Sequence, residues 1–74
     1  MNDGYWAMLA GAIVEQAIKD YRLVLKGLRR NSKNNRFLYH KSEVEDFFRS
    51  QWYRDLTRID GNKLIQELQE EYLL

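Results

Sequence analysis

The stretch Glu45–Ile65, EDFFRSQWYRDLTRIDGNKLI, decides how this 74-residue chain folds. From the position just before this stretch, apolar side chains recur every four residues: Val44, Phe48, Trp52 and Leu56. This is the spacing of one helix face. Asp60 and Gly61 then interrupt the pattern, and a new apolar run begins at Leu64. Asp60 is a good N-cap, so a second helix is predicted over about residues 61–73. The stretch therefore predicts two helices and much of the hydrophobic core.

The helix before that interruption is predicted over about residues 43–57. Ser42 precedes it, and Glu45 follows Ser42 by three positions, which is the spacing of a capping box. Ser50 can cap a separate short helix, so this region is either one kinked helix or two helices broken near residue 50. No stretch of the chain alternates as a half-buried strand does.

The first part of the chain predicts one long helix, over about residues 3–29. Apolar residues recur along it in steps of three and four: Trp6, Ala10, Ile13, Ala17, Tyr21, Val24 and Leu28. A helix of this length measures about 39 Å, so two shorter helices are too short to cover it. We expect an uncovered strip that binds a second copy or another protein. The candidates for this protein interface are Tyr5, Trp6, Leu9 and Leu23.

The expected fold is all-α, in a single domain over residues 1–74, with the two shorter helices packed back on the long one. The chain has no cysteine and no proline, so apolar packing must stabilise it without disulfides. The predicted core consists of Trp6, Ile13, Ala17, Tyr21, Phe47, Phe48, Trp52, Leu56, Leu64, Ile65 and Leu68. The alternative to a free strip is that the shorter helices also cover the candidate interface.

Charge is unevenly distributed along the chain. The net charge is +1, but residues 21–42 hold seven basic residues and no acidic one, between two flanks in which acids predominate. Such a basic segment is typical of contacts with phosphates. The candidate nucleic-acid contacts are Lys26, Arg29, Arg30, Lys33, Arg36 and Lys41. The alternative is a solvated basic face that complements the carbonyl groups at a helix end.

Residues 30–41 are predicted to form an irregular connection between the first two helices. Asn31, Ser32 and Asn34 compete for local backbone hydrogen bonds and favour turns. The single histidine, His40, is expected on this connection as a solvated side chain. A zinc site requires several cysteine or histidine ligands, and the chain has no cysteine and no second histidine. It also has no glycine-rich phosphate loop. We therefore expect a non-enzymatic protein without a metal site or cofactor.

A membrane role is not expected. The apolar run over residues 4–14 ends at Glu15 and is too short to span a bilayer, which takes about 20 residues. The first residues also lack the basic region of a signal peptide. We expect a cytoplasmic protein.

Two segments carry a resemblance to a known group. Ala12–Arg22 reads AIVEQAIKDYR, and Phe47–Ile65 contains FFRS-x-W followed by D-G-x-x-L-I, with a basic linker between the two. The chain resembles small helical proteins, without an established activity, that are carried by prophages and integrative elements of Gram-positive bacteria. This resemblance implies a mobile-element origin and a cytoplasmic location, and it implies no activity.

Together these patterns predict a non-enzymatic phage or mobile-element interaction protein. We expect it to form a homodimer or another homo-oligomer through its first helix, and to be able to bind a host or element protein. The alternative is a nucleic-acid-binding protein that uses residues 26–41.

Overall fold

A computed structural model of the chain describes residues 3–73, and helices account for most of them. The helices are α1 (Asp3–Arg30), α2 (Asn35–Phe48), α3 (Gln51–Leu56) and α4 (Gly61–Leu73). The described range contains no strand. The all-α class and the long first helix with shorter helices packed on it are confirmed.

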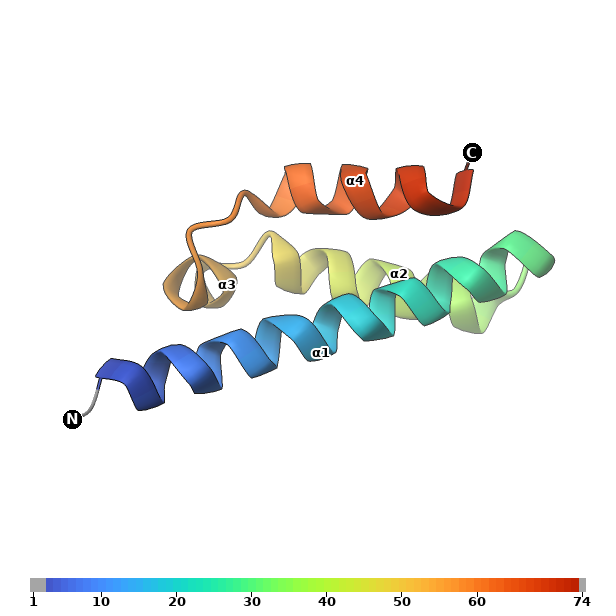
Figure 1. Ribbon diagram of the computed structural model, residues 1–74. Coiled ribbons are helices and arrows are strands. Elements are labelled where there is room, and N and C mark those ends of the chain that lie inside the picture. Colours follow the sequence, from blue (N-terminus) through green and yellow to red (C-terminus); the bar gives the residue numbers. More distant parts are fainter. Residues whose placement is uncertain (1–2, 74) are drawn as a thin grey trace.

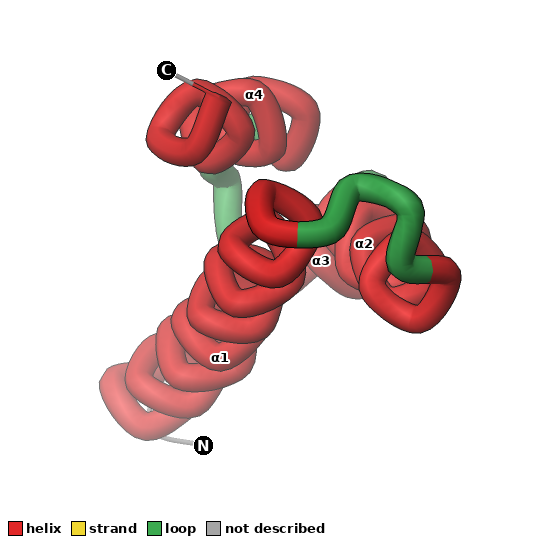
Figure 2. The backbone as a smooth tube through the Cα atoms, turned by 90° about the vertical axis from the view of Figure 1, so that its right-hand side faces the viewer, coloured by secondary structure: helices red, strands yellow, loops and turns green. Residues whose placement is uncertain are grey.

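The three longer helices form a small bundle. α2 returns antiparallel to α1, and α4 runs in the same direction as α1 (Figure 1). Seen close to the axis of α1, these three helices occupy the corners of a triangle (Figure 2). The short helix α3, of six residues, joins α2 to α4 at the end of the bundle nearer the N-terminus.

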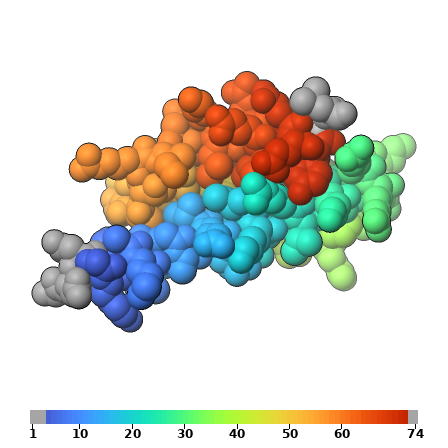
Figure 3. All heavy atoms as spheres, viewed as in Figure 1, coloured from blue at the N-terminus to red at the C-terminus, as the bar shows by residue number. Residues whose placement is uncertain are grey.

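Helix lengths determine the shape of the molecule. The 28 residues of α1 make a rod of about 42 Å, which sets the longest of the overall dimensions, 45 × 22 × 17 Å. The 14 residues of α2 and the 13 of α4 reach only about half as far. The first turns of α1 therefore project beyond the rest of the bundle (Figures 1 and 3).

The connection between α1 and α2 is much shorter than predicted. α2 begins at Asn35, so His40 lies in a helix and not on a loop. Ser42 and Glu45 also lie inside α2, and the predicted capping box at Ser42 is wrong. Only residues 31–34 form the turn.

Asn34 is the reason for the early start of α2. Its side-chain oxygen accepts a hydrogen bond from the backbone N–H of Phe37 at 3.1 Å, so it caps the helix eight residues before Ser42 could. The ring of Phe37 then lies against Gly27 of α1. A Cβ atom at Gly27 would come within 2.5 Å of that ring, so the absence of a side chain there lets the two helix ends meet.

The break near residue 50 is real, and two helices replace the single kinked one. α2 ends at Phe48, and Ser50 caps α3 by accepting a hydrogen bond from the backbone N–H of Tyr53 at 3.1 Å. The Ser50 hydroxyl also donates to the carbonyl oxygen of Phe47 at 2.6 Å. One serine thus stabilises both the end of α2 and the start of α3.

The start of α4 agrees with the prediction. Asp60 accepts hydrogen bonds from the backbone N–H groups of Asn62 and Lys63, at 2.9 and 3.2 Å. Gly61 follows it in close contact with the carbonyl group of Phe48, where no Cβ atom would fit. This contact brings the first turn of α4 against the end of α2.

An aromatic cluster forms the centre of the core. The Tyr21, Phe48 and Tyr53 side chains are almost completely buried. Their rings meet edge to face, with centroids 5.7 Å apart for Tyr21 and Phe48 and 5.6 Å apart for Phe48 and Tyr53. This is the favourable geometry for aromatic pairs, and it joins α1, α2 and α3. The other buried residues are Ala10, Val14, Val24, Leu25, Leu56, Ile65 and Leu68.

Two predicted core residues lie elsewhere. Trp52 is 49% exposed, and Tyr53, one position later, is buried in its place. The break at Ser50 changes the helical phase, so Phe48 and Trp52 do not share a face as they would in one continuous helix. Trp6 is 39% exposed because it lies in the projecting part of α1. Ile13, Ala17, Phe47 and Leu64 pack against the core from partly buried positions.

Candidate protein interface

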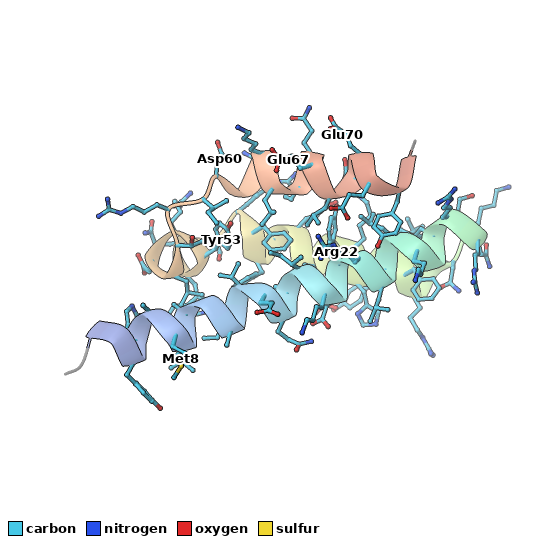
Figure 4. The ribbon with its side chains drawn as sticks, viewed as in Figure 1. Met8, Arg22, Tyr53, Asp60, Glu67 and Glu70 are labelled. Atoms are coloured by element: carbon cyan, nitrogen blue, oxygen red, sulfur yellow. The ribbon has the colours of Figure 1, made fainter. Side chains whose placement is uncertain are left out.

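The projecting turns of α1 carry large apolar side chains that the bundle leaves exposed. We call residues 5–9 the overhang. The exposed fractions of its large side chains are 60% for Tyr5, 39% for Trp6, 68% for Met8 and 42% for Leu9. Figure 4 shows Met8 directed away from α4, on the opposite side of the molecule from Glu67 and Glu70. Adjacent exposed side chains of this size are typical of an interaction site.

Beside the overhang, an open apolar groove runs between α1 and α2. Its volume is about 710 Å³, and all of its lining residues come from these two helices. The apolar lining residues are Ile13, Ala17, Leu23, Val24, Val44 and Phe47. The polar lining residues are Gln16, Asp20, His40 and Glu43. Since α4 packs on another side of α1, the groove stays open to solvent.

The overhang and the groove form one continuous surface. One side of α1 carries residues that are three, four or seven positions apart, as on one face of a helix. These residues are Tyr5, Leu9, Ile13, Gln16 and Leu23. Leu23 is 66% exposed and lies near the far end of the groove. The four predicted interface residues are therefore all exposed, three on the overhang and one on the groove.

Sequence reasoning missed part of this surface. Met8 was not predicted, although it lies beside Leu9 on the overhang. On the α2 wall of the groove, Phe47 was predicted as a core residue and Val44 as part of the apolar face of the second helix, and neither was predicted to line an open groove. The spacing of Phe37 and Val44, seven residues apart, is a helical signal that could have shown the longer α2.

On another side of α1, a partly buried polar network ties three helices together. The Tyr21 hydroxyl donates to a carboxylate oxygen of Glu45 at 2.5 Å, and the Gln69 amide donates to the Tyr21 oxygen at 3.1 Å. The Lys41 ammonium group lies 2.7 Å from the same Glu45 oxygen. Because these groups satisfy one another, the network fixes α1, α2 and α4 in register.

The network shifts the pKa values of two of its members. Burial opposes ionisation of Glu45, but the hydrogen bonds from Lys41 and Tyr21 outweigh it and hold the Glu45 pKa below its usual value. Burial, together with the hydrogen bond to Glu45, raises the pKa of Tyr21 well above its usual value. Glu45 is thus an ionised acceptor at neutral pH and Tyr21 a neutral donor, which suits a structural role.

The basic residues gather where α1 turns into α2. Lys26, Arg29, Arg30, Lys33 and Arg36 are all exposed there, and within the described part of the chain none of them forms an ion pair. We call these five residues the basic end. The sixth predicted contact, Lys41, is engaged by Glu45 and is only 29% exposed.

Metal-ligand clusters, membrane-spanning helices and similar proteins were each searched for. Over residues 3–73, no three His, Cys, Asp or Glu side chains converge as a metal site would require. His40 lies 3.3 Å from Glu43, as a helical neighbour. None of the described helices combines the length and the hydropathy needed to cross a bilayer. No protein family, curated protein or solved structure is significantly similar to this chain.

Proposed function

We propose that this chain is a non-enzymatic interaction protein that self-associates through α1. The observation that supports the proposal is the surface formed by the overhang and the groove. Burying apolar surface is favourable by about 25 cal/mol per Å², so covering these side chains drives association. Within the described residues, the chain has no segment of its own that reaches them.

A biological setting follows from the resemblance of Ala12–Arg22 and Phe47–Ile65 to small proteins of Gram-positive mobile elements. We place the chain in the cytoplasm, as the product of a phage or related element. A host or element protein is the second kind of partner for the same α1 surface.

Sedimentation equilibrium over a concentration series tests self-association. We expect the mass to rise with concentration toward twice that of one chain, and Leu9→Gln to weaken association at least tenfold. Ile59→Gln is the matched control, because Ile59 is also exposed but lies between α3 and α4, outside the two helices that line the groove. A wild-type mass that stays at one chain at every concentration, or equal effects of the two variants, contradicts the proposal.

Nucleic-acid binding by the basic end is the second candidate function. Its support is a cluster of five exposed cations without acidic partners in the described part of the chain. Cations of this kind bind phosphates and release counterions, so the affinity falls steeply with salt. The backbone N–H groups at the start of α2 lie at the same end and also favour anions.

Fluorescence anisotropy with labelled DNA and RNA at low salt tests this function. Arg29→Glu combined with Arg30→Glu is expected to abolish binding. Arg58→Glu combined with Lys63→Glu makes the same charge change at the other end of the bundle and is expected to retain most of it. Absence of binding at low salt, or an equal loss in both double variants, rules out a specific role for the basic end.

A further inference from the structure

The surface along α1 is self-complementary about one residue. Leu9 and Leu23 are both exposed, and each lies seven residues from Gln16. Positions separated by whole heptads drift by only about 20° per heptad around a helix, so all three share one side of the rod. Leu9 belongs to the overhang and Leu23 to the groove. The projecting part and the receiving part of the surface are therefore equally far from Gln16.

A two-fold rotation about Gln16, perpendicular to α1, exchanges these parts. It places Leu9 of one copy beside Leu23 of a second copy, and Leu23 of the first beside Leu9 of the second. Closed dimers use this kind of isologous contact, in which the same two patches meet twice. We propose that two copies pack α1 against α1 in antiparallel orientation, with Gln16 at the two-fold axis and Leu9 of each overhang packed against Leu23, at the end of the other copy's groove. This proposal rests on the self-association proposed above.

In this register the overhang of one copy reaches the end of the groove of the other copy. Tyr5 lies eleven residues from Gln16, so the rotation brings it level with Gly27, beyond Leu23 and close to the end of the groove where His40 lies. At the axis the two Gln16 side chains face each other, and an amide carries both donors and acceptors for a mutual hydrogen bond. A single polar pair in an apolar helix interface fixes its register, at some cost in affinity.

The area of the surface is sufficient for a dimer. The exposed parts of five large apolar side chains take part on each copy: Tyr5, Trp6, Met8, Leu9 and Leu23. Fully covering them on both copies removes roughly 1,000 Å² from water, close to the lower limit of a stable, specific interface. The rest of the groove wall adds to this area. We therefore expect association in the micromolar range, and not the tight binding of an obligate dimer.

Charge favours the antiparallel orientation over the parallel one. In a parallel pair, the two basic ends would lie side by side and repel each other, since ion pairs do not neutralise them. In the antiparallel pair, they lie at opposite ends of the dimer. The dipoles of the two α1 helices also oppose each other in that arrangement. A parallel pair would further leave the overhangs beside each other and both grooves open.

Cysteine cross-linking tests the geometry, because the natural chain has no cysteine. Gln16→Cys is expected to give a covalent dimer with a short bis-maleimide reagent. Leu9→Cys alone and Leu23→Cys alone are expected to give none, because like positions lie about 21 Å apart in the antiparallel pair. An equal mixture of these two variants is expected to cross-link. Glu67→Cys, on the side of α4 that faces away from α1, is the negative control (Figure 4).

The outcomes separate the two proposals. Cross-linking of Leu9→Cys with itself, or a dimeric chain without a Gln16→Cys product, overturns the antiparallel geometry and leaves self-association standing. A chain that stays monomeric in sedimentation overturns both. Ala12→Cys mixed with Asp20→Cys is the next pair about the same axis. It keeps the test decisive if Gln16→Cys weakens association, since failure of this mixture also counts against the geometry.

Discussion

The two sides of α1 differ sharply in how far the rest of the chain covers them. Tyr21 is completely buried, whereas Leu23, two residues later and on the opposite side of the helix, is 66% exposed. The buried side packs on the aromatic cluster and is hydrogen-bonded to the network that contains Glu45 and Gln69. The open side has the overhang and the groove. The comparison shows that two half-length helices can stabilise a long rod and still leave one side of it available for a partner.

The largest expected effect comes from breaking the buried side. Phe48→Ala should lower the free energy of unfolding by about 3–5 kcal/mol, because it removes a ring that is 1% exposed from the centre of the cluster. Trp52→Ala is the matched change on an exposed aromatic residue and should have an effect below about 1 kcal/mol. Urea denaturation followed by circular dichroism measures both. Equal losses would show that Trp52, and not only Phe48, supports the core.

The glycines provide the next contrast. Gly61→Ala should destabilise the fold by about 1–3 kcal/mol, because its Cβ would overlap the carbonyl group of Phe48. Gly11→Ala should stabilise it by roughly 0.5–1 kcal/mol, since Gly11 is mid-helix and nothing lies within 4 Å of the added atom. Thermal unfolding of the two variants checks the signs. A stabilising Gly61→Ala would mean that α4 does not start against the end of α2.

Two buried tyrosines should respond in opposite ways to loss of the hydroxyl. Tyr21→Phe should cost about 1–2 kcal/mol, because it leaves Glu45 and Gln69 without their shared partner. The Tyr53 hydroxyl is buried without a hydrogen-bond partner in the described part of the chain, so Tyr53→Phe should be neutral or stabilising. Chemical denaturation of each variant gives the comparison. A clear loss for Tyr53→Phe would contradict the placement of its hydroxyl.

A smaller effect is expected on acidification. The Glu45 pKa is lower in the folded chain than its value of about 4.3 in an unfolded chain. The stabilisation that this difference provides is present above the unfolded pKa and is lost as the pH falls through the folded pKa. Glu45→Gln should therefore make the unfolding free energy less dependent on pH below about 4.3. If the unfolding free energy of this variant depends on acidic pH as strongly as that of the wild type, Glu45 does not contribute to the pH dependence.

The sequence was sufficient for the fold class but not for the register of every helix. The spacing of Ala10, Ala17, Tyr21 and Val24 predicts α1, because the helical period of apolar residues can be recognised without knowledge of tertiary contacts. The start of α2 depended on a competition between two good caps, Asn34 and Ser42. The contact of Phe37 with Gly27 adds tertiary stabilisation to the earlier start, and the sequence pattern does not show that contact.

The candidate interface was partly predictable for the same reason. Tyr5, Trp6 and Leu9 follow from the length of α1, and Leu23 follows from an apolar stripe that is wider than one helix face. The groove also depends on how far apart α1 and α2 pack and on His40 lying in a helix, and the sequence pattern shows neither. Trp52 and Tyr53 are adjacent and similar in size. The break in helical phase at Ser50 determines that Tyr53 is buried and Trp52 is exposed.

Hydrogen exchange at increasing protein concentration tests most directly the claim that one side of α1 awaits a second copy. Amides of the overhang should exchange quickly in dilute solution and slow markedly as the concentration rises, whereas those around Tyr21 should be protected equally at every concentration. Exchange in the overhang that is independent of concentration, whether fast or slow, would contradict the account.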